Sequence, residues 1–159
     1  MNTNALILYL DHLQPDEEMA VSYTIDPAFL DFNPKDEVQP SRPVVVEGTC
    51  SLVDDFVILN LLVKAFFSVH CAHCNEQFEY EVCIDHFAHQ ELLENIEQKK
   101  WNLSEIVREA IVLELPFFPQ CGGKKCLHID ELRKYFHVQT QEKDEGNSSP
   151  FQSFFDTVQ

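Results

Sequence analysis

Basic side chains are scarce in this sequence. Only 11 Lys and Arg stand against 27 Asp and Glu in 159 residues, which gives a net charge of -16. Nucleic-acid binding depends largely on Lys and Arg that displace counterions, so this balance argues against broad wrapping of RNA or DNA. The acidity serves either to keep the protein in solution or to attract a basic partner. A local contact with RNA stays open, because some basic residues gather in pairs: Lys99 with Lys100, Lys124 with Lys125, and Arg133 with Lys134.

The sequence also lacks long apolar runs. None approaches the roughly 18 to 20 residues of a membrane-spanning helix, and the first residues lack the basic and apolar regions of a secretory signal. We therefore expect a cytoplasmic protein without membrane contact, whose six cysteines are reduced thiols rather than disulfides. Cys50 and Cys83 fall within strand-like runs, and we expect both thiols to be buried and inert.

The length and the 45% hydrophobic content fit one domain better than two. We expect a single domain over residues 1–138, a polar linker over 139–149 and a Phe-rich motif over 150–159. We expect the protein to be a monomer.

A short apolar run predicts a strand over 5–10, and further strands are predicted over 19–25, 44–53, 56–69 and 78–87, mainly from alternation of apolar and polar residues. The first two are joined around Pro15, and the run over 56–69 is apolar enough for the centre of a sheet. Asp26 and Pro27 are typical of the start of a short helix. The fold class is therefore α+β: an antiparallel sheet, either a meander or a partly closed barrel, with one main packed helix and a few short helices.

The main helix is predicted over residues 103–115. Asn102 can cap its first amides while Glu105 bonds back to the cap, and Pro116 discourages continuation. Shorter helices are expected over 92–99 and 127–138. Apolar residues recur at helical spacing along one stripe of the main helix, which we expect to cover the sheet: Leu103, Ile106, Val107, Ala110, Ile111 and Leu115.

Two cysteine pairs indicate a metal site. Cys71 and Cys74 are three residues apart between two strand-like runs, at the tip of a predicted hairpin. Cys121 and Cys126 follow the main helix, in a loop that glycines make flexible. Four thiolates suit one tetrahedral zinc ion. The alternative is that both pairs are reduced and free of metal.

Two catalytic alternatives have weaker support. A metal-dependent hydrolase or ribonuclease would use Asp85, His86, His89 and Glu91, but the HExxH pattern is missing and side chains alternate faces along a strand.

The second alternative is a nucleophilic Cys71 activated by His70 or His73, although a thiol bound to metal is not free to attack. These histidines are either solvent-facing or substitute metal ligands. We expect no enzyme activity.

The last residues form an apolar stripe, with Phe151, Phe154, Phe155 and Val158 at positions i, i+3, i+4 and i+7. This stripe either docks on its own domain or binds a partner. Both alternatives stay open.

Three features resemble the YceD-type proteins, which are associated with accumulation of large-subunit ribosomal RNA. They are residues 71–78 (Cys-Ala-His-Cys-Asn-Glu-Gln-Phe), residues 102–116 followed by Pro119, and the tail around Pro150 and Phe151. The resemblance covers the second half of the chain well and the first half only by pattern. His73 stands where the family usually has Arg.

Many family members carry a fuller cysteine cluster after the helix, where this chain has Cys121 and Cys126. The resemblance implies a non-enzymatic role in synthesis, processing or stability of 23S ribosomal RNA. It also implies ribosomal or ribosome-assembly proteins as partners, with direct RNA contact left open.

Overall fold

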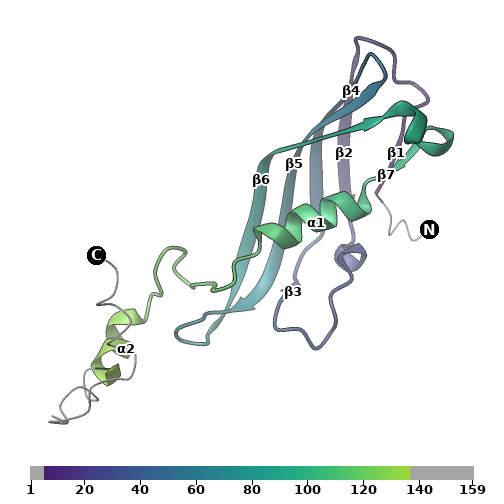
Figure 1. Ribbon diagram of the computed structural model, residues 1–159. Helices are drawn as coiled ribbons and strands as arrows, with labels where there is room; N and C mark the ends of the chain where they lie inside the picture. Colours follow the sequence, from purple (N-terminus) through teal and green to yellow (C-terminus); the bar gives the residue numbers. More distant parts are fainter. Residues whose placement is uncertain (1–5, 137–159) are drawn as a thin grey trace, which may run out of the picture.

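The computed structural model describes residues 6–136 (Figure 1). The predicted linker and Phe-rich motif, including Phe151, Phe154, Phe155 and Val158, lie outside the described residues. The strands are β1 (Ile7–Tyr9), β2 (Glu18–Ile25), β3 (Gln39–Pro40), β4 (Val44–Val53), β5 (Phe56–His70), β6 (Gln77–Leu92) and β7 (Lys100–Asn102). The α-helices are α1 (Ser104–Glu114) and α2 (Ile129–Phe136), and the 3₁₀ helices are η1 (Pro27–Leu30), η2 (Leu93–Asn95) and η3 (Glu97–Lys99).

The main sheet is antiparallel and has five strands. Its order is β2-β4-β5-β3, and β6 pairs with β5 along nearly its whole length. The sheet is open, so of the two predicted forms the chain adopts the meander. The α+β prediction is confirmed, and the long β5–β6 hairpin carries Cys71 and Cys74 at its tip (Figure 1).

β1 does not join this sheet. It pairs with β7 to form a separate two-stranded sheet, in which Leu8 lies opposite Trp101. Leu8 is 3% exposed and Trp101 is 9% exposed, so this small sheet closes one end of the core. The sequence shows that the three residues of β1 are apolar, but it does not show which strand they pair with.

One face of the main sheet is buried beneath α1 (Figure 1). Alternate residues of β5, from Val57 to Val69, point into this core, as the sequence periodicity predicts. Val107 and Ile111 of α1 are fully buried, and α1 contacts β5, β6 and η1. The predicted covering helix is therefore confirmed.

The start of α1 is fixed by two side chains. The side-chain oxygen of Asn102 accepts a hydrogen bond from the amide of Ser104 (3.0 Å), so Asn102 does satisfy one amide of the first turn as predicted. The N-cap residue is Leu103 rather than Asn102, however, and it makes no side-chain capping bond. The Ser104 hydroxyl accepts a buried hydrogen bond from the amide of Leu6 (2.9 Å). Arg108 donates to the carbonyl of Leu30 (2.8 Å), which joins the middle of α1 to η1.

β6 runs to Leu92, five residues beyond its predicted end, and contains a bulge. Leu61 pairs with Phe87 and Val63 with Ile84, so Asp85 and His86 together oppose a single residue of β5. The inward-facing positions therefore change from even to odd numbers along β6. Such a shift in phase obscures the alternation by which a strand is recognised in a sequence.

The structure also tests the predictions for two cysteines, for a helix over 92–99 and for membrane-spanning helices. Cys50 is buried as predicted, whereas Cys83 is exposed, because it lies on the face of β6 opposite α1. The helix expected over 92–99 is instead η2 and η3, with Gln98 in a left-handed conformation. Within residues 6–136, no helix has the length and apolarity needed to cross a membrane.

Candidate metal centre

The hairpin tip turns tightly enough to bring Cys71 and Cys74 together. The Cys71 carbonyl accepts a hydrogen bond from the amide of Asn75, and the Cys71 amide donates to the carbonyl of Glu76, each at 2.9 Å. Asn75 adopts a left-handed conformation with φ 59°. Asn tolerates this region better than most residues, so the local sequence supports the turn.

The second pair lies on the loop between α1 and α2. Gly123 has φ 77° and donates its amide to the Gln120 carbonyl (2.9 Å). A Cβ atom at Gly122 would lie 2.2 Å from the Lys125 carbonyl oxygen, so this tight loop requires glycine there. The loop is held against the hairpin tip, because the Ala72 amide donates to the Pro119 carbonyl (2.8 Å).

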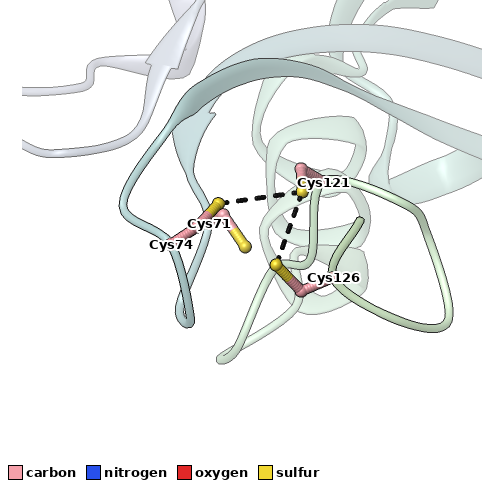
Figure 2. Close-up of side chains that lie close together, drawn as sticks. All are labelled: Cys71, Cys74, Cys121 and Cys126. Carbon is pink, nitrogen blue, oxygen red and sulfur yellow. Dashed lines mark hydrogen bonds between the residues drawn. The ribbon is translucent and has the colours of Figure 1, made fainter. Parts of the chain in front are cut away.

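These two loops bring the four sulfurs together (Figure 2). All four Sγ atoms lie within 4.8 Å of one another, and Cys121 Sγ is 3.8 Å from both Cys74 Sγ and Cys126 Sγ. A tetrahedral zinc ion with Zn–S bonds of about 2.3 Å places neighbouring sulfurs about 3.8 Å apart. The spacing therefore suits a single metal ion bound by four thiolates.

The burial of the cluster is typical of a structural site. Cys71 and Cys126 are buried, and Cys74 and Cys121 are half-buried. Four protein ligands complete a tetrahedral shell and leave no open position for a substrate or a reactive water, unlike the three-ligand sites of zinc enzymes.

The ionisation of the thiols also favours a cation. Burial opposes ionisation of Cys71, but backbone hydrogen bonds from Cys74, His73 and Cys121 outweigh it and lower the Cys71 pKa to about 6. The backbone hydrogen bond from Glu76 favours ionisation of Cys74, yet burial and the neighbouring sulfurs raise its pKa to about 12. Because the four sulfurs are close neighbours, a divalent cation would allow all of them to be thiolates together.

Burial, as the largest cause, also raises the pKa of Cys126. Beside the sulfurs, His128 Nε2 lies 3.0 Å from a carboxylate oxygen of Glu76 and so joins the second loop to the first. The sequence analysis did not predict a role for His128. The only feature that could have indicated one is that His128 lies two residues after Cys126.

His70 and His73 are exposed and do not belong to the group of ligand atoms. Of the two interpretations left open for them, solvent-facing side chains fit the structure. Among the described residues, the four cysteines are the only group of three or more Cys, His, Asp or Glu whose ligand atoms gather in this way.

The alternative cluster on β6 is dispersed. Asp85 and His86 are exposed at the bulge, whereas the His89 ring stacks on Phe87 with centroids 6.3 Å apart. A Glu91 oxygen accepts hydrogen bonds from the Asn95 side chain (2.6 Å) and the Leu92 amide (3.2 Å), which lower the Glu91 pKa. These side chains have separate local partners and do not form a metal-ligand group.

Comparisons of the chain with protein-family models, with curated proteins and with solved structures gave no match.

Proposed function

We propose that Cys71, Cys74, Cys121 and Cys126 hold a structural zinc ion. The sulfur spacing and the closed set of four soft ligands support this assignment. The ion would join the β5–β6 hairpin tip to the loop after α1, two segments about fifty residues apart in the chain.

We further propose that the protein is a non-enzymatic, cytoplasmic factor that supports synthesis, processing or stability of 23S ribosomal RNA in large-subunit biogenesis. The observation that carries this proposal is the meeting of the two cysteine pairs, because Cys71 and Cys74 belong to the segment that resembles YceD-type proteins. A closed thiolate site fits a binding protein better than an enzyme. Ribosomal or ribosome-assembly proteins are the proposed partners, and a basic one would complement the net charge of -16.

The zinc assignment is tested by elemental analysis of protein purified without added metal. One zinc per chain is the expected result. A purified chain that contains iron instead, or that binds no zinc when zinc is supplied to the reduced protein, would contradict the assignment.

The cellular role is tested with a tagged chain recovered from cells that express it naturally. We expect large-subunit ribosomal proteins, assembly factors or 23S precursors in the eluate, and a lower 23S level in cells that lack the chain. A tag attached to an unrelated protein is the control. Recovery of none of these components, together with an unchanged 23S level, would overturn the proposal.

A further inference from the structure

The segment that follows the second cysteine pair differs in charge from the rest of the protein. Residues 121–136 contain four Lys or Arg and two Asp or Glu, a balance of +2, although the whole chain carries -16. The other residues therefore total -18. This segment therefore offers a polyanion a local excess of cations.

The cations come from two elements that meet. Lys125 Nζ lies 3.8 Å from an oxygen of Asp130, and an Arg133 guanidinium nitrogen lies 3.6 Å from the same oxygen. A loop cation and an α2 cation thus share one carboxylate, and their side chains stay 61% and 62% exposed. Lys124 and Lys134 are exposed as well. We call Lys124, Lys125, Arg133 and Lys134 the basic cluster.

Large apolar side chains in the same part of the chain are unusually exposed. Phe117 is 97% exposed, Phe118 is 78% exposed and Tyr135 is 77% exposed. Leu127, next to Cys126, is 73% exposed. Exposed aromatic groups that accompany cations are the two components of surfaces that bind single-stranded nucleic acids, because bases stack on the rings while cations contact the phosphates.

The remainder of the molecule directs a polyanion to this end. Glu81 and Asp85 are exposed on β6 and repel phosphate. Figure 1 shows α2 beyond the tip of the β5–β6 hairpin, at the opposite end from β1 and β7. A zinc ion with four thiolates carries a formal charge of about -2, but its sulfurs are buried or half-buried while the basic cluster is exposed.

We propose that this end of the protein binds single-stranded RNA. The basic cluster contacts the phosphates, and Phe117, Phe118 and Tyr135 provide stacking surfaces for the bases. The choice of RNA over another polyanion rests on the proposed role in 23S ribosomal RNA. The metal centre holds the loop with Lys124 and Lys125 against the hairpin tip, so that the cations are presented together.

The test uses the full-length, zinc-loaded chain and a fluorescently labelled 12-nucleotide oligouridylate, with binding followed by anisotropy at about 50 mM salt. Lys124→Gln combined with Lys125→Gln should weaken binding about tenfold and reduce the slope of log affinity against log salt by about 1.4. The matched control combines Lys99→Gln with Lys100→Gln at the other end of the molecule and should stay within about twofold, because those cations lie away from the basic cluster.

Stacking is tested separately with Phe117→Ala combined with Phe118→Ala. Both rings are largely exposed, so the fold should be unaffected, which circular dichroism checks. Affinity should fall about tenfold while the salt slope stays unchanged, because phosphate contacts are retained. An unchanged affinity would show that the rings do not stack on bases and would overturn the proposed mode of binding.

Three other results would also overturn the inference: no binding by the native chain, an equal loss in the Lys99 and Lys100 control, or competition by polyglutamate as strong as by RNA of the same charge. The last result would identify the surface as a site for acidic proteins.

The proposed function is tested independently. Cells that lack the chain and have a reduced 23S level, combined with no oligouridylate binding, would remove only the RNA surface. An unchanged 23S level and no ribosomal partner would remove the function.

Discussion

At the scale of single residues, the four cysteine sulfurs decide the chemistry of the centre. Cys74 and Cys121 have sulfurs 3.8 Å apart although they are separated by 47 positions. Cys83 lies in the same strand-rich part of the chain but is exposed, and its sulfur donates to a carboxylate oxygen of Asp85 (3.2 Å). That hydrogen bond raises the Cys83 pKa. Position in the fold thus separates a candidate metal ligand from a surface thiol of the same type.

The first prediction uses this contrast. Cys74→Ser replaces a thiolate by a hydroxyl, a poor zinc ligand, and should lower the zinc content from one per chain to near zero in elemental analysis. Cys83→Ser is the matched control and should retain the zinc. Full zinc content in the Cys74 variant would show that this residue is not a ligand.

At position 48 the structure requires a residue without a side chain, which is glycine. Its φ is 156°, and a Cβ atom there would lie 2.1 Å from the Asn60 carbonyl oxygen on the neighbouring strand. Gly48→Ala should therefore lower the free energy of unfolding by about 1–3 kcal/mol, as overpacking does in well-packed sites. Urea denaturation measures this loss. The neighbouring exposed Glu47→Ala should change stability by less than about 0.5 kcal/mol, and equal effects would refute the steric explanation.

At the scale of elements, α1 stabilises the sheet through one face. Ile111 is fully buried, whereas Leu113, two residues further along the same helix, is 76% exposed. The two side chains have nearly the same size and hydrophobicity. Their contributions to stability should differ because only one of them is removed from water on folding.

Ile111→Ala should cost about 2–5 kcal/mol, since it loses buried apolar area and leaves a cavity. Leu113→Ala should change stability by less than about 0.5 kcal/mol. Both are measured by urea denaturation under the same conditions. A comparable loss in the two variants would mean that the outer face of α1 is also covered in solution.

At the scale of the whole molecule, the candidate metal centre lies outside the main core. The core cluster unites the inner faces of the sheet with α1 and Trp101, and none of the four clustered cysteines belongs to it. The sheet and α1 therefore have an apolar core of their own. The segment with α2 meets them at the four cysteines and through polar contacts such as the Ala72 amide with the Pro119 carbonyl.

Removal of the metal should consequently release only one end of the protein. After chelation, hydrogen exchange of the Ala72 amide and of amides in α2 should speed up, while the central amides of β5 keep their protection. Hydrogen exchange with mass spectrometry measures both regions in one sample, and re-addition of zinc should restore protection. Global loss of protection would show instead that the core depends on the metal.

Much of the architecture follows from local patterns. Alternation placed β4 and β5 to within one residue, and the stripe of apolar residues placed α1, because these signals arise from one buried face per element. The same approach found β6 but missed its last five residues, beyond the bulge at Asp85 and His86 that reverses the inward phase. It found β1 but not its partner β7, which lies about ninety residues away.

The sequence by itself determined the four thiols, the turn that can pair Cys71 with Cys74, and the strands and helix that carry them. Only the tertiary structure decided that Cys121 and Cys126 meet this first pair and that Cys83 faces away from the core. The physical reason is range: periodicity and turn chemistry act between near neighbours, whereas these juxtapositions depend on where the sheet and α1 bring distant segments together.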